Sequence, residues 1–232
     1  GRRPGGAAPH ERRAGAARRG WTPQGPTEGS KRSRLLGTYA GSWPDLLDRL
    51  RSGSGPECMV ILCGANPGNL GSVMRHCPLL GVTAVCVLGG LSRSVLRKTL
   101  RTSQVEKYPK REVELYLAPD SCAPAAALAE LRAAGLTLAG LTAEPAKCGG
   151  ATALWESDLS VPGLGFVMGA DTDDSEPFPS GVAEQLDLAV TIPMLSFYDK
   201  DALNVSHTVS IVAYERWRQR SLRTAPELLD CH

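Results

Sequence analysis

The chain has 232 residues, 42% of them hydrophobic, and a formal net charge of +2. This length suits one globular domain with a sizeable core, and no apolar run approaches the roughly 20 residues of a membrane-spanning helix. The seven cysteines form no Cys-x-x-Cys pair and the four histidines are scattered. Both patterns argue against a disulfide framework and a metal site, and they favour reduced thiols inside a cell.

Charge divides the chain unevenly. Residues 1–34 hold nine Lys/Arg and two Glu, whereas residues 35–232 hold 17 basic and 22 acidic side chains. The first segment has almost no large apolar residues, so we expect a disordered basic tail. It could be an RNA-attracting arm, the remnant of a transit peptide or a solvated leader. We expect an intracellular protein, in the cytoplasm unless this tail directs it to an organelle.

Beyond the tail, the pattern predicts strands alternating with helices. A short helix is expected at residues 42–51, capped by Ser42. Strand-length apolar segments follow at residues 58–63, 83–88, 113–117, 136–141, 164–168 and 188–192. Helices are expected between or after them at residues 69–80, 92–102, 124–134, 181–186 and 202–219. The prediction is an α/β domain with a mainly parallel six-stranded sheet and helices on both faces.

This pattern also divides the chain into segments. We expect a basic tail at residues 1–34, a short helical lead-in at 35–56, the main domain at 57–222 and a C-terminal tail at 223–232. In parallel sheets, ligands bind outside the carboxyl ends of the strands. The loops to search for a site therefore follow Cys63, Leu141, Met168 and Ile192.

The first of these loops is rich in glycine and asparagine. Asn69 is expected to cap a helix that carries Arg75, and Pro78 is expected to kink or shorten that helix. The loop has neither the Gly-x-Gly-x-x-Gly spacing nor a Gly-Lys-Ser/Thr ending. A doubly wound nucleotide-binding protein stays an alternative, but the missing phosphate loop argues against it.

The last helix combines an apolar face with a polar start. We expect Asp201 to cap it. One face is predicted to be apolar and to comprise Leu203, Val209, Val212, Ala213 and Trp217. Three polar residues, Asn204, Ser206 and His207, fall in the first turn, where free backbone amides are available to a ligand.

Three segments together resemble the SpoU/TrmH family of RNA ribose 2′-O-methyltransferases, within the SPOUT superfamily. They are Asn66-Pro-x-Asn69-x-Gly71-x-x-x-Arg75 followed by Gly81-Val82, then Phe166-Val-Met-Gly169, and then Ile192-Pro-Met with Leu203-Asn-Val-Ser206 and Tyr214-Glu-x-x-Arg-Gln-Arg220. The resemblance covers residues 58–220. It implies a trefoil-knotted α/β fold that binds S-adenosylmethionine within the knot, and a homodimer whose active site draws on both subunits.

The resemblance also assigns roles to residues. It places Arg75 on the ribose 2′-hydroxyl, Asn69 and Asn204 beside it, and Asp171 where the family has a glutamate. An arginine suits this role because a guanidinium stays charged when partly desolvated and can stabilise a developing alkoxide. The cofactor cradle carried over comprises Leu141, Thr142, Met168, Gly169, Ile192, Met194, Ala202 and Leu203.

Two departures from the family pattern leave an alternative open. The chain has Gly169-Ala-Asp171 where the family has Gly-Asn-Glu, and Ala202-Leu-Asn-Val where it has Ser-Leu-Asn-Val. Each lost hydrogen bond could cost about 1–3 kcal/mol. The leading prediction is S-adenosylmethionine-dependent methylation of an RNA ribose, without a metal or a membrane. tRNA is favoured over rRNA because residues 167–169 and 216–220 look most like the TrmH branch. The alternative is a catalytically impaired homologue that acts as an RNA-binding or scaffold protein.

Overall fold

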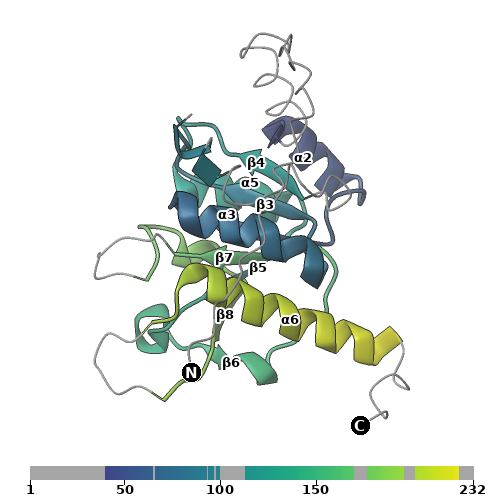
Figure 1. The fold of residues 1–232 in the computed structure, drawn as a ribbon, viewed down its shortest axis with the longest axis vertical. Coiled ribbons are helices and arrows are strands. Elements are labelled where there is room, and N and C mark those ends of the chain that lie inside the picture. Colours follow the sequence, from purple (N-terminus) through teal and green to yellow (C-terminus); the bar gives the residue numbers. More distant parts are fainter. Residues whose placement is uncertain are drawn as a thin grey trace, which may run out of the picture.

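A parallel β-sheet forms the middle of the molecule in the computed structural model (Figure 1). The structure describes residues 40–64, 66–92, 94–96, 98–99, 113–169, 177–195 and 202–224. In this part of the chain, none of the helices combines the length and the apolarity needed to cross a membrane.

The sheet contains the six predicted strands and two short ones at its edges. Its order is β1-β4-β3-β2-β7-β5-β8-β6. The strands are β1 (Ala40–Gly41), β2 (Cys58–Leu62), β3 (Ala84–Val87), β4 (Glu114–Leu117), β5 (Thr137–Leu141), β6 (Thr152–Ala153), β7 (Leu164–Met168) and β8 (Leu188–Thr191). The prediction of six strands was too low, because the two-residue strands β1 and β6 are too short to leave a periodic signal.

Every strand pair within the described ranges is parallel, so the sheet is more regular than the mainly parallel one expected. The central strands β2 and β7 are buried along their whole length. Continuous apolar runs produce such strands when helices cover both faces of a sheet. The α/β fold class is therefore confirmed, while the trefoil knot stays a prediction.

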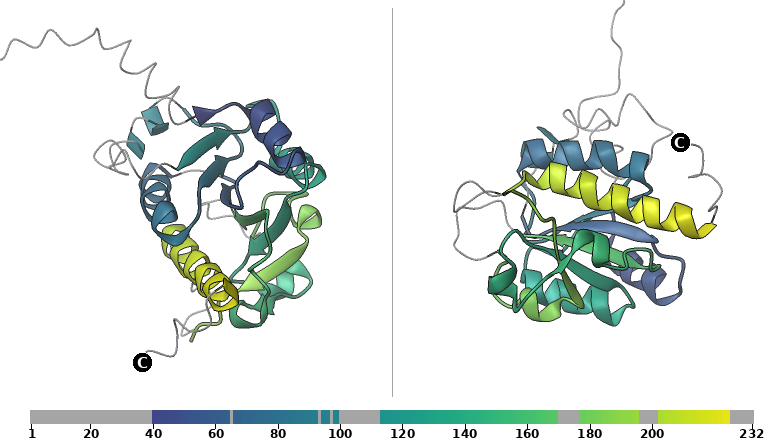
Figure 2. Two further views of the ribbon diagram at one scale, coloured as in Figure 1. Left: turned by 90° about the vertical axis from the view of Figure 1, so that its right-hand side faces the viewer. Right: turned by 90° about the horizontal axis from the view of Figure 1, so that it is seen from below.

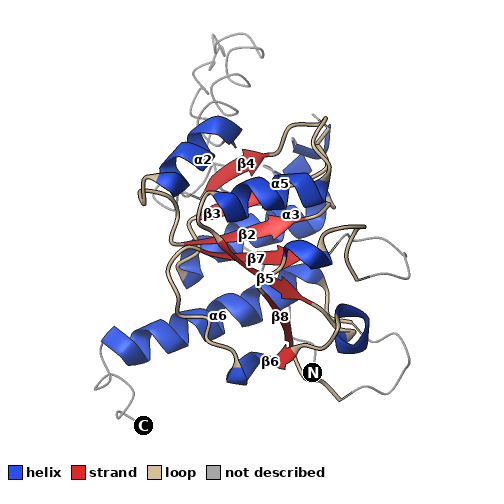
Figure 3. Ribbon diagram, turned by 180° about the vertical axis from the view of Figure 1, so that it is seen from behind, coloured by secondary structure: helices blue, strands red, loops and turns tan. Residues whose placement is uncertain are grey.

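Helices cover the sheet on both faces, and each face has its own apolar core (Figure 2, Figure 3). Helices α3 (Pro67–His76) and α6 (Val205–Thr224) cover one face, and α2 (Trp43–Arg51) and α5 (Pro124–Ala133) cover the other. The described residues also form short 3₁₀ helices: η1 (Cys77–Leu80), η3 (Pro145–Cys148), η4 (Leu154–Glu156) and η5 (Ala183–Gln185).

Two expected helices differ from the structure in extent. The helix expected at residues 181–186 is only the 3₁₀ turn η5, because the segment is too short to close several α-helical turns. Residues 94–96 and 98–99 are helical, in agreement with the helix expected at 92–102, but the remainder beyond residue 99 lies outside the described residues. Ser42 caps α2 as predicted, since its hydroxyl accepts the amide hydrogen of Asp45 at 3.2 Å.

The cap predicted for α3 was wrong. Asn66 caps the helix, and its side-chain oxygen accepts the amide hydrogen of Gly68 at 2.8 Å. Pro67 takes the first helical position, where its missing amide hydrogen costs nothing. Asn69 therefore lies in the first turn of the helix. Pro78 falls in η1, and α3 ends at His76, so the expected shortening is confirmed.

Helix α6 begins later and ends later than expected. Asn204 precedes its first residue, and the side-chain oxygen of Asn204 accepts the amide hydrogen of Ser206 at 2.9 Å. Asp201, the predicted cap, lies outside the described residues. On the apolar face, three of the expected residues are buried, but Leu203 is 37% exposed and Trp217 is 46% exposed. Arg216, only 4% exposed, takes the buried position next to Trp217.

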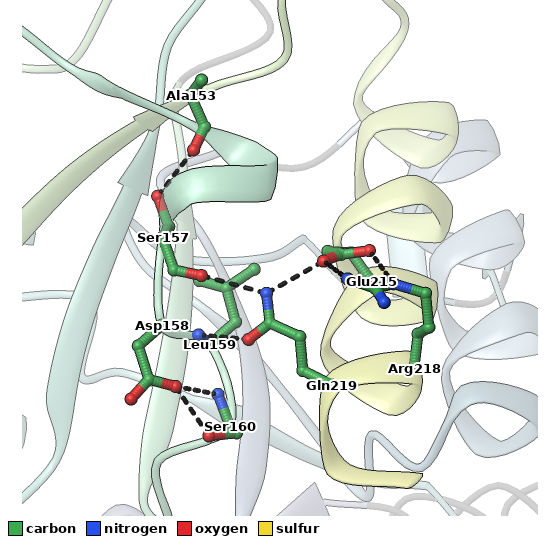
Figure 4. Close-up of polar contacts among 8 residues, drawn as sticks. All are labelled: Ala153, Ser157, Asp158, Leu159, Ser160, Glu215, Arg218 and Gln219. Carbon is green, nitrogen blue, oxygen red and sulfur yellow. Dashed lines mark hydrogen bonds and ion pairs between the residues drawn. The ribbon is translucent and has the colours of Figure 1, made fainter. Parts of the chain in front are cut away.

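Polar contacts fix the second half of α6 on the rest of the domain (Figure 4). The Gln219 amide donates to the carbonyl oxygen of Ser157 at 3.0 Å, and its oxygen accepts the amide hydrogen of Leu159 at 2.8 Å. The Arg216 guanidinium donates to the carbonyl oxygens of Glu57 and Val161, each at 3.1 Å. These contacts join the second half of α6 to the segment before β7 and to the residue before β2.

Candidate functional site

A cavity of about 210 Å³ lies where the carboxyl ends of three neighbouring strands meet the start of α6. Leu141, at the end of β5, is in register with Met168 on β7 and with Val190 on β8. The lining includes all eight residues predicted for the cofactor cradle, Leu141, Thr142, Met168, Gly169, Ile192, Met194, Ala202 and Leu203. The structure therefore brings together a set of residues that spans more than 60 positions of the sequence.

Five further lining residues were missed: Ala143, Glu144, Pro177, Val205 and Thr208. Ala143 and Glu144 directly follow β5, so the rule that ligands bind beyond strand ends could have included them. Val205 and Thr208 lie in the first turn of α6, beside the predicted Leu203. Nothing in the sequence pointed to Pro177, because it lies neither at a strand end nor in a family motif and reaches the cavity only through tertiary folding.

The turn after β5 is held by Thr142, whose side chain is buried. Its backbone amide donates to the carbonyl oxygen of Val190 at 3.0 Å, and its hydroxyl oxygen accepts the amide hydrogen of Glu144 at 2.9 Å. These contacts extend the β5–β8 pairing by one residue and then turn the chain away from the sheet. These hydrogen bonds of Thr142 therefore hold the backbone that forms one wall of the cavity.

Gly169 allows two chain segments to approach closely on another wall. A Cβ atom at this position would lie 2.0 Å from the carbonyl oxygen of Pro177, far inside any real contact distance. Only glycine can occupy the position without displacing Pro177. Ala170 and Asp171 follow immediately and lie outside the described residues, so the predicted catalytic role of Asp171 stays a prediction.

The cavity is mainly apolar, with backbone groups at the strand ends. Among its described lining residues, Glu144 has the only ionisable side chain, and its carboxylate forms a 2.5 Å ion pair with Lys147. Such a lining suits a flat, partly apolar ligand that hydrogen-bonds to backbone groups.

Two predicted catalytic residues meet beside this cavity, between α3 and α6. The Asn204 amide nitrogen donates to the side-chain oxygen of Asn69 at 2.9 Å. The side-chain oxygen of Asn204 accepts hydrogen bonds from the backbone amide of Ser206 at 2.9 Å and from its hydroxyl at 2.8 Å. Asn204 directly follows Leu203, which lines the cavity. The asparagine pair is therefore adjacent to the space that a ligand would occupy.

Arg75 does not join this pair within one chain. It lies in the last turn of α3, is exposed, and makes no hydrogen bond or ion pair with any residue that the structure describes. It lies six positions after Asn69, which is about 9 Å along the helix axis and about a third of a turn around it. The neighbouring His76 instead contacts α6, with 3.0 Å between its Nδ1 and the hydroxyl of Ser210.

The basic segment at the end of α6 is mostly neutralised within the chain. Arg218 pairs with Glu215 at 2.7 Å, Arg220 pairs with Glu57, and Arg223 pairs with Asp158 at 3.1 Å. The hydrogen bond from Arg218 is the main cause that lowers the pKa of Glu215. Burial lowers the pKa of Arg216. The arginines of residues 216–220 therefore act largely as structural anchors.

Comparison with known families and structures agrees with this geometry. Residues 58–214 match the model of the SpoU rRNA Methylase family. An RNA 2′-O ribose methyltransferase is 25% identical with a TM-score of 0.55, and the match covers 72% of this chain and 58% of that one. An AdoMet-bound rRNA methyltransferase from Sinorhizobium meliloti is 20% identical with a TM-score of 0.55, covering 73% of this chain and 59% of that one.

A third similar structure is the A. aeolicus TrmH/SpoU tRNA modifying enzyme. It is 20% identical with a TM-score of 0.52, and the match covers 78% of this chain and 85% of that one. No curated protein sequence matches this chain. The chain spans less than two thirds of the length of the first two structures. Because the family model matches more than half of its residues, this chain belongs to the SpoU rRNA methylase family, in the SpoU/TrmH group of the SPOUT superfamily.

Proposed function

We propose that this protein transfers a methyl group from S-adenosylmethionine to a ribose 2′-hydroxyl of RNA. The observation that carries the proposal is the cavity at the ends of β5, β7 and β8, which lies directly beside the Asn69–Asn204 pair. Such a transfer needs a pocket that holds the methyl donor and polar groups that hold the acceptor. The cavity would serve the donor, and the two side-chain amides would serve the acceptor. The 25% identical RNA 2′-O ribose methyltransferase supports the same reaction.

The lining of the cavity fits S-adenosylmethionine. Leu141, Met168, Ile192 and Leu203 offer apolar surface for a purine ring, and the strand ends offer backbone groups for its edges. Gly169 leaves room where any Cβ atom would collide with Pro177. Glu144 lies at the edge of the cavity, but its ion pair with Lys147 leaves it little free charge. When bound, the cofactor supplies a methyl group on a positively charged sulfur.

The residues of this chain would prepare the acceptor. The transfer would join the ribose oxygen to the methyl carbon as the bond from that carbon to sulfur breaks, and the hydroxyl proton would pass to water. Ribose hydroxyls are weak nucleophiles, so the reaction depends on orientation and on stabilising negative charge on oxygen. Asn69 and Asn204 would orient the ribose, and Arg75 would stabilise the developing alkoxide. Asp171 would stand in for the glutamate of the family.

We infer that Arg75 acts across a homodimer. Its guanidinium forms no hydrogen bond or ion pair with any described residue of its own chain, and it lies about 9 Å from Asn69 along the helix axis. An exposed arginine without a partner among the described residues is available to a second copy. A homodimer would then place Arg75 of one protomer at the cavity of its partner. Light scattering of the purified chain, giving a mass twice that of 24.6 kDa, would support this arrangement.

tRNA is the proposed substrate class, and rRNA is the alternative. The paired arginines of α6 contribute little free charge, so the choice rests on the likeness of residues 167–169 to the TrmH branch. The test incubates the full chain with S-adenosylmethionine labelled in its methyl group, with bulk tRNA and bulk rRNA in separate reactions. We expect label in tRNA, and its loss in Arg75→Ala. Label in rRNA alone would reassign the substrate.

A failure to label either RNA would overturn the proposed reaction, provided that the chain still binds the cofactor. This outcome would favour the second candidate, a catalytically impaired RNA-binding or scaffold homologue. One observation supports that candidate: Ala202 lines the cavity at the place where the family has a serine. If activity has decayed, Ala202→Ser combined with Ala170→Asn and Asp171→Glu should raise it strongly. No change in these variants would argue for adaptation.

A further inference from the structure

We propose that the Glu144 carboxylate binds the ribose hydroxyls of S-adenosylmethionine and so helps to determine which ligands the cavity accepts. The inference rests on the proposed function and deepens it by assigning one part of the cofactor to one side chain. Glu144 lies three positions beyond the end of β5 and lines the cavity. An acidic side chain beyond the end of a parallel strand suits a nucleoside, because two neighbouring ribose hydroxyls can both donate to one carboxylate.

The backbone of Glu144 is already engaged, which leaves its side chain for a ligand. Its amide hydrogen is donated to the hydroxyl oxygen of Thr142 at 2.9 Å, and its carbonyl oxygen accepts the amide hydrogen of Lys147 at 3.1 Å. These two hydrogen bonds fix the backbone on both sides of the residue. The carboxylate is therefore the main acceptor that Glu144 can offer to a ligand in the cavity.

The carboxylate keeps room for further donors. Its Oε2 forms the ion pair with the Nζ of Lys147, three positions along in η3, at 2.5 Å. The Glu144 side chain is still 52% exposed in spite of this pair. A carboxylate has about four lone-pair sites on its two oxygen atoms, and one ammonium group occupies only part of them. Two hydroxyl groups can therefore join the ion pair without breaking it.

The ion pair also selects the kind of donor. Because the charge of Lys147 offsets that of Glu144, a cationic group at this place would meet an ammonium group as well as the carboxylate. Neutral hydroxyl groups meet no such repulsion, and they still form hydrogen bonds to an ionised acceptor. The amino group and the sulfur of S-adenosylmethionine carry positive charge, and its adenine ring suits the apolar interior of the cavity. The ribose is therefore the part that fits the exposed edge where Glu144 lies.

The test measures binding, by isothermal titration of the full chain with S-adenosylmethionine, with S-adenosylhomocysteine and with 2′,3′-dideoxy-S-adenosylhomocysteine. Glu144→Gln removes the charge at nearly constant size, and Glu144→Asp keeps the charge on a shorter side chain. Glu156→Gln is the matched control. Glu156 is an exposed glutamate in the 3₁₀ helix η4 and is not one of the described residues that line the cavity.

We expect Glu144→Gln to weaken the binding of S-adenosylhomocysteine about tenfold, the effect of hydrogen bonds to a charged acceptor, and that of the dideoxy analogue less than twofold. The affinity for S-adenosylmethionine should fall by the same factor as that for S-adenosylhomocysteine, since the two ligands share the ribose and differ in the charge on sulfur. Glu144→Asp should keep part of the affinity, and Glu156→Gln should match the wild type.

Two results of these titrations would overturn the assignment. An equal loss for S-adenosylhomocysteine and its dideoxy analogue would mean that Glu144 binds another part of the ligand. A loss confined to S-adenosylmethionine would make Glu144 a partner of the charged sulfur. Lys147→Gln adds a further check, because the difference between the two analogues should persist without the ion pair. Its disappearance in Lys147→Gln would assign the ribose to the lysine instead.

Failure of this inference can be told apart from failure of the proposed function. A wild type that binds both cofactors but methylates no RNA would overturn the reaction, and the same titrations would still decide the role of Glu144. Wild-type affinity in Glu144→Gln would overturn the ribose assignment alone. A wild type that binds neither cofactor would overturn both.

Discussion

Gly169→Ala should weaken cofactor binding by distorting one wall of the cavity. The added Cβ atom would lie 2.0 Å from the carbonyl oxygen of Pro177, whereas ordinary contacts begin at 3.4 Å. The two segments must therefore separate by about 1.4 Å. Overpacking of this kind typically costs about 1–3 kcal/mol. Because Gly169 and Pro177 both line the cavity, the displacement would reach the ligand directly.

Isothermal titration with S-adenosylmethionine measures the effect. A weakening of at least tenfold is expected, since about 1.4 kcal/mol corresponds to a factor of ten in affinity. Gly53→Ala is the matched control, because Gly53 has a φ of 74° and no atom within 4 Å of an added Cβ. That variant should lose about 1–2 kcal/mol of stability through backbone strain and keep wild-type affinity. Wild-type affinity in Gly169→Ala would refute the reasoning.

Three further predictions concern the stability and chemistry of the fold. Gln219→Ala should lower the free energy of unfolding by about 1–3 kcal/mol, because it leaves the amide of Leu159 without its partner; a urea titration that finds no change would contradict this. Arg218 lowers the pKa of Glu215 below 4.5, so the stabilisation should be present above that pH and be lost on further acidification. The stability difference between the wild type and Glu215→Gln should therefore shrink in acid, and a constant difference across pH 3–7 would refute it. Burial raises the pKa of the Cys58 thiol to about 12 and shifts Cys63, Cys77 and Cys86, the other buried cysteines among the described residues, in the same direction. Alkylation at pH 8 should thus spare all four until the chain is denatured, as mass spectrometry of the labelled peptides can show.

The central strands could be predicted from sequence because burial on both faces leaves an unbroken apolar run. The residues of β2 and β7 are all apolar or glycine, and both strands are fully buried. The edge strands β1 and β6 have two residues each and pair through backbone groups alone, so their side chains carry no pattern. Their existence depends on neighbours that local sequence does not reveal.

Helix boundaries were harder to predict, because several residues in a row can serve as caps. Asn66 and Asn69 both precede apolar positions, and only the fixed backbone of Pro67 favours the first. On α6, Arg216 and Trp217 are adjacent, about 100° apart on the helix. The periodicity of apolar residues predicted that Trp217 would be buried against the core. The structure buries the arginine because its guanidinium reaches two carbonyl oxygens that belong to distant segments.

The sequence could locate those parts of the candidate site that lie at strand ends or in family motifs. The eight residues expected around the cofactor all line one cavity, whereas Pro177 reaches it only through tertiary folding. The contact between Asn69 and Asn204 joins residues 135 positions apart, which no local pattern can establish. The position of Arg75 at the far end of α3, without a hydrogen bond or ion pair among the described residues, also became visible only in the structure.

The most direct test of the central claim identifies the atom that receives the methyl group. The full chain is incubated with methyl-labelled S-adenosylmethionine and RNA, the RNA is digested to nucleosides, and mass spectrometry separates sugar from base fragments. The account predicts that the label stays with the ribose fragment and that Arg75→Ala removes it. Label on the base fragment would contradict the proposed chemistry.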